Sequence, residues 1–415
     1  MARLIPSLLL FPALLCAQPE GLFIESTAQG AVKINIAIKP FSPKTPGLTQ
    51  KPADLPWKVI ANDLALSGRF TVTETASTDT ALFRSKNIAV YIDGLYDFHE
   101  GKVILDGLLY DALSGNLIVA KQYSVEEGRV RRAAHLFSDE VVYRLFGDKG
   151  IASTRLVCVE KAGKAKEISI VDYDGAGKTR VTNNGWLNLT PAWSPDGKGV
   201  VYTSYRQQTP ALYVTWIYTG KTDRLTKNNR LNFAPVWNGV EDKIAFASSM
   251  NGDCAVYTME KDGSGLKRLT FHAALESSPS FSPNGYEIAY TSDRTGNPQI
   301  YIMDNEGTGT RRLTYEGKYN DAPSWSPKGD RIAYMSMADG RFDIYTIAID
   351  GTDAKRLTKD AGNNEHPSYS PDGRLLVFSS TRAGGTDLYL ISEDGGDPVR
   401  ITFSGNLDSP EWSKY

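Results

Sequence analysis

The sequence has few of the residues that support cross-links, metal sites or acid–base catalysis. It holds three cysteines and four histidines in 415 residues. After the first 18 residues only Cys158 and Cys254 remain, without the dense framework of a disulfide-stapled protein or the close spacing of a metal site. The repeat described below places them in non-adjacent units. We therefore expect two buried free thiols.

The sequence also lacks an excess of either charge. Its 46 Lys and Arg residues are balanced by 48 Asp and Glu residues, which are interleaved along the chain and give a net charge of −2. A protein that binds a phosphate backbone needs a basic excess or a basic stripe. With 41% hydrophobic residues, the composition is typical of a soluble globular protein with no nucleic-acid partner.

Long hydrophobic runs are absent except at the start, which reads MARLIPSLLLFPALLCAQ. Roughly 14 mostly apolar residues, interrupted by Pro6 and Pro12, are fewer than the roughly 20 that span a bilayer. One arginine, an apolar stretch and the small residue Ala17 are typical of a secretory signal. We predict that residues 1–17 direct export and are removed.

Two patterns recur along residues 151–415 with a period of 44, which is shortened to 43 before the last copy of the first pattern. The first is proline, any residue and an aromatic residue, usually followed by Ser-Pro-x-Gly. It begins at Pro191, Pro235, Pro279, Pro323, Pro367 and Pro410. The second is arginine, an aliphatic residue and threonine, and it begins at Arg180, Arg224, Arg268, Arg312, Arg356 and Arg400.

Each repeat reads as four short strands separated by turns. In the unit at Pro279, strands are expected around the aromatic motif and over 287–292, 299–303 and 310–314, with Gly-rich turns between them. Four strands in about 44 residues are typical of a propeller blade. Three strands precede Arg180 and one follows Asp408, so the ends complete a sixth blade. We predict a six-bladed β-propeller closed by the C-terminal strand.

Residues 18–150 lack this period and predict a separate α/β domain. Alternation over 32–38 indicates a strand, and PWKVIANDLAL (56–66) indicates a helix. Strands are expected over 87–93 and as a hairpin over 102–125. Apolar residues recur at helical spacing from Val130 to Leu145, which predicts a helix that docks on these strands. The fold class is therefore an N-terminal α/β domain followed by the propeller.

The order of these segments resembles the TolB family of periplasmic proteins. The likeness rests on LPWKVIANDLALSGRF (55–70), RRAAHLFSDEVVYRLFGDKG (131–150), STRLVCVEK, VDYDG and the PxWSPDG repeats ending in PEWS, and it covers essentially the whole mature chain. The resemblance implies a monomeric, non-enzymatic periplasmic adaptor of the Tol-Pal envelope system, which supports outer-membrane integrity and cell division.

The resemblance also implies two partner sites. The peptidoglycan-associated lipoprotein Pal would bind at the propeller's channel mouth, and TolA would bind the segment 18–29, including Phe23 and Ile24. The residues expected to meet the lipoprotein lie just before the motif prolines. They are Leu231, Asn232, Phe233, Ala234, Glu276, Ser277, Asn320, Asp321, Glu365 and His366.

The repeat phase further predicts which residues ring the channel. Two positions before each motif proline stand Leu189, Phe233, Ser277, Asp321, Glu365 and Asp408, and three positions before stand Asn188, Asn232, Glu276, Asn320, Asn364 and Leu407. Carboxylates on consecutive blades raise one another's pKa or attract a cation. We expect solvated loop acids here, with a Ca2+ ion near Asp321, Glu365 and Asp408 as the alternative.

Two other function classes stay open on the residues alone. A propeller can carry a hydrolase or lyase site, but neither Gly-x-Ser-x-Gly nor His-Glu-x-x-His occurs. Of the four histidines, only His366 falls in the channel register. A glycan- or peptide-binding envelope protein unrelated to Tol-Pal is the second alternative. The motif tryptophans could serve such binding, but their shared phase predicts packing between blades.

Overall fold

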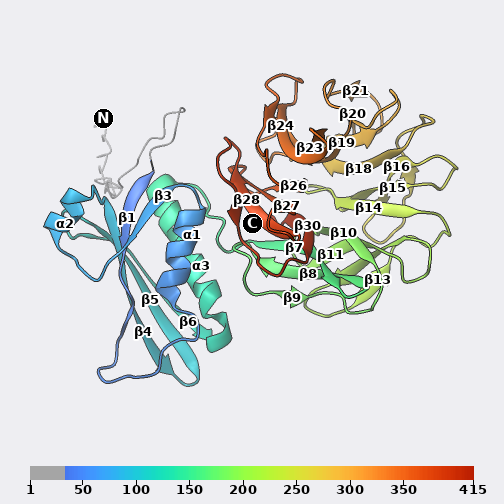
Figure 1. Ribbon diagram of the computed structural model, residues 1–415. Coiled ribbons are helices and arrows are strands. Elements are labelled where there is room, and N and C mark those ends of the chain that lie inside the picture. The colour runs from blue at the N-terminus through green and yellow to red at the C-terminus, as the bar shows by residue number, and fades with distance from the viewer. Residues whose placement is uncertain (1–32) are drawn as a thin grey trace, which may run out of the picture.

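The protein, seen here as a computed structural model that describes residues 33–415, has two domains joined by a short connection (Figure 1). One is an α/β domain and the other is a ring of six small sheets. The predicted export signal 1–17 and the segment 18–29, with Phe23 and Ile24, lie outside the described residues. No helix within 33–415 is long and apolar enough to cross a membrane.

The N-terminal domain is built on one mixed sheet with the strand order β3-β1-β4-β5-β6, and a short strand β2 pairs with β4. The strands are β1 (Ile34–Ile38), β2 (Ser42–Pro43), β3 (Phe70–Glu74), β4 (Val90–His99), β5 (Lys102–Asp111) and β6 (Leu117–Glu126). Strand β1 is parallel to β3 and β4, whereas β4, β5 and β6 are antiparallel. Isoleucines at alternate positions of β1 point to the buried face, as the sequence predicts.

Two helices, α1 (Pro56–Leu66) and α3 (Val130–Phe146), cover one face of this sheet. Helix α1 has the predicted bounds, because Pro56 occupies its first turn without losing a hydrogen bond. Helix α3 ends at Gly147, which adopts the left-handed conformation and donates to the carbonyl of Tyr143 at 2.8 Å. The short helices α2 (Thr80–Ser85) and η1 (Glu127–Arg129) complete the domain. Both long helices lie between the sheet and the propeller (Figure 1).

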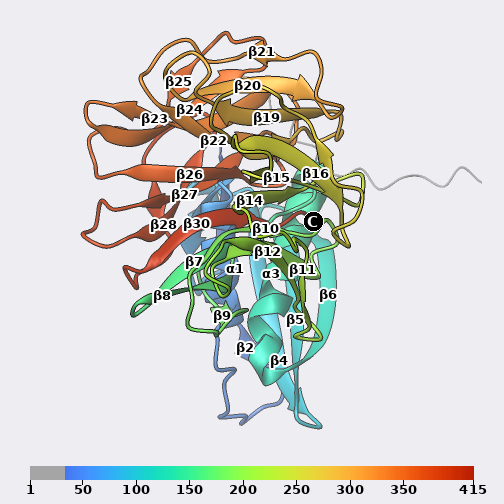
Figure 2. The same ribbon diagram turned by 90° about the vertical axis from the view of Figure 1, so that its right-hand side faces the viewer.

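The propeller consists of six four-stranded antiparallel sheets, which Figure 2 shows fanned around one axis. Five of them are continuous in sequence. Their strands, from the axis outward, are β10 (Asn188–Trp193), β11 (Gly199–Ser204), β12 (Ala211–Trp216) and β13 (Thr222–Arg224); β14 (Asn232–Trp237), β15 (Lys243–Ser248), β16 (Ala255–Glu260) and β17 (Lys267–Arg268); β18 (Glu276–Phe281), β19 (Glu287–Ser292), β20 (Gln299–Asp304) and β21 (Arg311–Arg312); β22 (Asn320–Trp325), β23 (Arg331–Ala338), β24 (Arg341–Ala348) and β25 (Lys355–Arg356); and β26 (Asn364–Tyr369), β27 (Leu375–Ser380), β28 (Asp387–Ser392) and β29 (Val399–Arg400).

The sixth blade joins both ends of the propeller, as predicted. The C-terminal strand β30 (Leu407–Trp412) is its innermost strand and pairs with β7 (Arg155–Ala162), followed by β8 (Ala165–Asp172) and β9 (Thr179–Arg180). Trp412 lies opposite Leu156, and its indole N–H donates to the Thr154 hydroxyl at 2.8 Å. The ring is therefore closed by segments far apart in the sequence.

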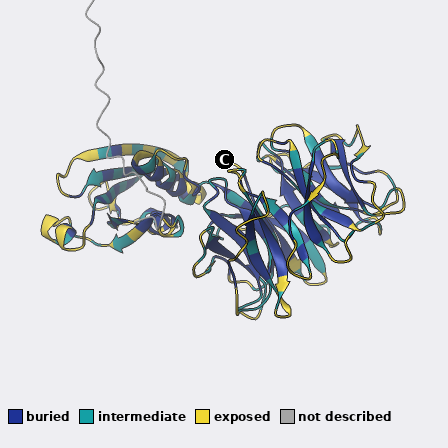
Figure 3. Ribbon diagram, turned by 90° about the horizontal axis from the view of Figure 1, so that it is seen from above, coloured by how far each residue is buried: buried dark blue, intermediate teal, exposed yellow. Residues whose placement is uncertain are grey.

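The motif aromatic residues pack between neighbouring blades, which confirms that the motif tryptophans belong to the core. Figure 3 shows that the strands of the propeller are largely buried. The six motif aromatic residues are all among the buried residues: Trp193, Trp237, Phe281, Trp325, Tyr369 and Trp412. Trp237, for example, packs with Ala192, Val201 and Leu212 of the preceding blade. Each aromatic ring therefore fills the gap that two twisted sheets leave between them.

Candidate docking site at the propeller channel

The propeller axis is a narrow channel of about 180 Å3 lined by the residue before each motif proline, the proline itself and the residue after it. The residues before the prolines all have positive φ angles of 46–54°. They are Thr190, Ala234, Ser278, Ala322, His366 and Ser409. For residues other than glycine this conformation costs about 1 kcal/mol each, so the surrounding blade imposes it.

A bulge in each innermost strand produces this conformation. In β10, Leu189 pairs with Thr203 and Ala192 pairs with Val201, so Thr190 and Pro191 together oppose one residue of β11. The same register shift occurs in the other five blades. A proline cannot donate to the sheet, and a bulge accommodates it while turning the preceding residue toward the axis.

The predicted ring two positions before each proline surrounds one mouth of the channel, and it divides into two halves. Leu189, Phe233 and Ser277 form an apolar and neutral half on three consecutive blades. Asp321, Glu365 and Asp408 form an acidic half on the other three. All except Ser277 keep part of their surface exposed. We call these six residues the mouth ring.

Ion pairs partly balance the acidic half. The Nδ1 atom of His366 lies 3.5 Å from a carboxylate oxygen of Asp408, and Lys166 Nζ lies 3.7 Å from the other. Burial opposes the charges of both His366 and Asp408, but their contact outweighs it, raising the pKa of His366 and lowering that of Asp408. Burial raises the pKa of Glu365. The half remains negative because Asp321, Glu365 and Asp408 face one histidine and one lysine.

The ring predicted three positions before each proline is not at the channel, so that prediction is wrong. Asn232, Glu276 and Asn320 have no exposed surface. Neighbouring residues of a strand point to opposite faces, and these side chains bond to buried groups of their own blade or of the preceding one. The side-chain oxygen of Asn232, for example, accepts from the Ser248 hydroxyl at 2.9 Å. In this structure the three residues therefore offer nothing to a partner.

The loops beside the mouth ring expose apolar side chains that the family resemblance predicted only in part. Leu231, one of the predicted partner residues, is 47% exposed, and the corresponding Leu275 of the next blade is 52% exposed. Trp186 and Leu187 are also exposed on the preceding blade. The last three were not predicted, although Leu187 and Leu275 stand at the same position of the repeat as Leu231. The apolar half of the mouth ring therefore continues outward over three blades.

The expected Ca2+ site concerns three carboxylates of the mouth ring. Asp321, Glu365 and Asp408 stand at equivalent positions of consecutive blades, and carboxylates suit this ion. In the described part of the chain, however, the ligand atoms of these three residues do not come within 4.8 Å of one another. Ca2+ binding here stays a prediction that would require the carboxylates to converge.

A second ring of contacts, also missed, links the blades at the other end of the channel. The side chain after the motif proline accepts a hydrogen bond from the main-chain N–H of the next blade's aromatic residue. The pairs are Ser280 with Trp325 (3.2 Å), Ser324 with Tyr369 (3.3 Å), Ser368 with Trp412 (3.0 Å) and Glu411 with Trp193 (2.6 Å). Only Glu411 is ionisable, and burial in the channel wall raises its pKa to about 8.

The two domains meet through a buried polar cluster centred on Asp63 of α1. Its carboxylate accepts from His135 Nδ1 at 2.9 Å, from the Ser138 hydroxyl at 2.7 Å and from the propeller residue Tyr173 at 3.1 Å. Burial opposes the charge of His135, but Asp172 and Asp63 outweigh it and raise its pKa to about 10. Burial raises the pKa of Asp63 as well. His135 therefore carries the proton at neutral pH.

This cluster includes the one group of possible metal ligands found in residues 33–415, namely Asp63, His135 and Asp174. Their ligand atoms lie within 4.8 Å of one another. However, Asp63 already accepts hydrogen bonds from three side chains, and Asp174 pairs with Arg131. The carboxylate oxygens that could bind a metal already accept hydrogen bonds or pair with the Arg131 guanidinium. The cluster is therefore an ion-pair network that joins the domains.

Comparison with known families supports the resemblance seen in the sequence. A profile described as "TolB beta propeller domain" matches residues 142–344 and 319–415, and one described as "TolB amino-terminal domain" matches residues 22–91. The chain belongs to the TolB family. A crystal structure of TolB from Acinetobacter baumannii superposes with a TM-score of 0.81 at 26% identity, covering 92% of this chain and 97% of that one.

Curated TolB-family sequences match over shorter lengths. "Protein TolB homolog" of Chlorobium chlorochromatii is 33% identical over 234 residues, which is 53% of this chain and 52% of that protein. "Tol-Pal system protein TolB" of Geobacter metallireducens is 39% identical over 206 residues, 46% of this chain and 47% of that protein. The chain thus spans about half the length of these TolB relatives.

Proposed function

We propose that this chain is a non-enzymatic adaptor of the Tol-Pal envelope system in the periplasm. It would bind the peptidoglycan-associated lipoprotein Pal at the mouth ring and TolA through residues 18–29, and so support outer-membrane integrity and cell division. Membership of the TolB family supports the system, and relatives bear the name "Tol-Pal system protein TolB". The mouth ring, half apolar and half acidic, is the observation that supports a docking role.

The arrangement at the channel favours docking over catalysis. His366 is the one histidine in the channel lining. Both the Ser409 hydroxyl and the Asp408 carboxylate face its Nδ1 atom at 3.5 Å. A serine nucleophile and an orienting carboxylate must occupy opposite nitrogens of the imidazole for proton relay. The histidine is better suited to neutralising the acidic half of the mouth ring.

A binding measurement tests the lipoprotein site. Isothermal titration of the mature protein with the soluble domain of Pal should give saturable 1:1 binding. Leu231→Asp and Leu275→Asp each place a charge in the exposed apolar arc and should weaken binding at least about tenfold. Tyr286→Asp, at an exposed position on the opposite face of the ring, is the matched control. Equal affinity of all three variants would disprove the site.

A deletion tests the second partner. Removing residues 18–29 should abolish binding of purified TolA and leave the affinity for Pal unchanged, because the mouth ring lies wholly in the propeller. If TolA still binds after this deletion, its binding site lies elsewhere on the chain.

A further inference from the structure

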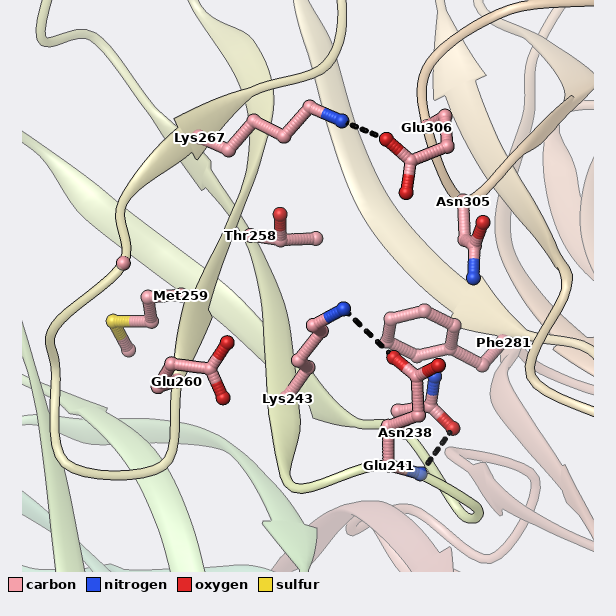
Figure 4. Close-up of a pocket in the computed structure, with 11 residues that line it drawn as sticks. Asn238, Glu241, Lys243, Thr258, Met259, Glu260, Lys267, Phe281, Asn305 and Glu306 are labelled. Atoms are coloured by element: carbon pink, nitrogen blue, oxygen red, sulfur yellow. Dashed lines mark hydrogen bonds and ion pairs between the residues drawn. The ribbon is translucent and has the colours of Figure 1, made fainter.

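The face of the propeller opposite the mouth ring carries a hollow of about 250 Å3 between the blades β14–β17 and β18–β21 (Figure 4). Its charged lining consists of Glu241, Lys243, Glu260, Lys267 and Glu306. We call it the interblade hollow. The α/β domain docks on the same face of the ring, but against the blades that contain Tyr173 and Asp372. Within 33–415, no hydrogen bond or ion pair joins that domain to the two blades of the hollow.

The hollow arises from a departure from the repeat. The second blade has Asn-Gly-Val-Glu-Asp at 238–242, where its neighbours have the Ser-Pro-x-Gly turn. Asn238 supports this turn by accepting from the main-chain N–H of Val240 at 2.8 Å and of Glu241 at 3.2 Å. In this altered turn Glu241 points toward Lys243, with which it forms an ion pair of 2.8 Å (Figure 4).

The charges of the interblade hollow leave one carboxylate unpaired. Lys267 of one blade pairs with Glu306 of the next, and Lys243 pairs with Glu241. Glu260 lies opposite Lys243 in the register of β15 and β16, yet over the described residues it forms no ion pair of its own. Three glutamates thus face two lysines, and the excess negative charge resides on a half-buried side chain. An occupant with one positive charge complements it.

Apolar side chains stand exposed around the interblade hollow. Val240 is 66% exposed, Leu266 is 47% exposed and Tyr286 is 67% exposed. Val240 precedes the lining residue Glu241, and Leu266 precedes Lys267. The carbonyl of Tyr286 accepts from the N–H of the lining residue Asn305 at 2.8 Å. A central charge inside an apolar rim is the arrangement in which a partner excludes water from an ion pair.

We propose that the interblade hollow is a second protein-docking site, which receives a lysine or arginine side chain flanked by apolar residues of a partner. Its volume is below the 300–1,000 Å3 or so of pockets that hold drug-sized ligands, and it suits one long side chain. The basic group reaches Glu260, and the flanking residues cover Val240, Leu266 and Tyr286. The site faces away from the mouth ring, so both can be occupied at once.

Fluorescence anisotropy with the full mature chain tests this proposal. The probes are fluorescein-labelled nonapeptides with one central lysine flanked by leucine, valine or tyrosine, and matched peptides with norleucine or glutamate in place of the lysine. The best lysine peptides should bind with a dissociation constant below about 100 µM. Norleucine should weaken binding about tenfold, and glutamate should abolish it.

Variants separate the hollow from adventitious peptide binding. Glu260→Gln should lower affinity for the lysine peptide about tenfold without affecting the norleucine peptide, and the double variant Val240→Asp, Tyr286→Asp should remove both. All three side chains are partly or largely exposed, so an unchanged melting temperature is the check on folding. Equal binding of lysine and norleucine peptides, or an unaffected Glu260→Gln variant, overturns the proposal. Pal affinity should stay unchanged throughout, so this test fails or succeeds independently of the mouth ring.

Discussion

The strongest energetic prediction concerns the buried cluster between the domains. Asp63→Asn keeps the shape of the side chain but leaves protonated His135 without its closest carboxylate. Removing one partner of a buried ion pair costs about 3–5 kcal/mol. For a domain of this size, 3 kcal/mol corresponds to a melting temperature lower by about 12 °C. The matched control is Asp93→Asn, whose part-exposed pair with Lys39 is expected to contribute under about 1 kcal/mol.

The assay is thermal and urea unfolding followed over pH. His135 has a folded-state pKa of about 10, above its ordinary value of 6.5. Its contribution to the free energy of unfolding is therefore complete below pH 6.5 and is lost as the pH rises through 10. One proton allows a slope of at most about 1.4 kcal/mol per pH unit in that window.

Asp63→Asn removes one of the two carboxylates, Asp172 and Asp63, that hold this proton, so the dependence should become shallower. Calorimetry should also show the transitions of the two domains moving apart in the variant, because the interface couples them less strongly. A wild-type profile that is flat between pH 6.5 and 10, or a variant as stable as Asp93→Asn, would refute the assignment of an ion-pair lock.

Three further outcomes follow from the propeller. Trp412→Ala should cost about 3–5 kcal/mol and shift the whole propeller transition in urea, since the strand that carries it closes the ring; loss of a single local transition would contradict the closure. Glu411→Gln should keep the acceptor for the Trp193 N–H. It should abolish the fall in stability expected from pH 4.5 to 8, because a carboxyl with a raised pKa stabilises the fold only while protonated. An unchanged pH profile would indicate that Glu411 is exposed to solvent. Reducing agent should change the melting temperature by less than about 1 °C, because Cys158 and Cys254 are free. Burial raises the pKa values of their thiols to about 12 and 11, so thiol reagents should label them slowly until the protein unfolds.

The architecture could be predicted because it repeats. The period of 44 residues fixes the number of blades, and the complementary fragments before Arg180 and after Asp408 predict that β30 joins β7–β9. Helix α1 was predicted with its observed bounds, since Pro56 and Gly68 mark its ends. Cys158 and Cys254 are unpaired, as expected from their positions in different blades, but only Cys158 is fully buried and Cys254 is partly exposed. These features depend on local signals or on identical copies, which a single sequence displays.

The channel was only half predictable. The mouth ring follows from the period, but the side chains of Asn232, Glu276 and Asn320 turn away from it because neighbouring residues of a strand point to opposite faces. The bulge at each motif proline turns the residue before that proline toward the axis. The alternation of apolar and polar residues along one strand does not reveal a bulge, because a bulge is defined by pairing with the neighbouring strand. The motif proline itself was the available signal, because it cannot donate within a sheet.

The domain interface was missed for a different reason. Asp63 and His135 occupy positions on the buried faces of α1 and α3, where apolar residues are expected. A charged residue inside an apolar stripe signals a buried partner, but the partner Tyr173 lies in the other domain and has no fixed spacing from either helix. The interblade hollow likewise depends on the contact of two blades, although the missing Ser-Pro-x-Gly turn at 238 marks its place.

Ring closure by the C-terminal strand determines when the propeller can be completed during biosynthesis. Trp412 and Thr154, which a hydrogen bond joins, are 258 positions apart in the sequence. At about 5–20 residues per second, the ribosome delivers the tryptophan some 13–50 s after the threonine. Throughout that interval the edge of β7 has no neighbour, and an edge of this kind readily accepts strands from other molecules. A chaperone that shields residues 155–162 until the C-terminal strand pairs with them would therefore reduce aggregation of the incomplete chain.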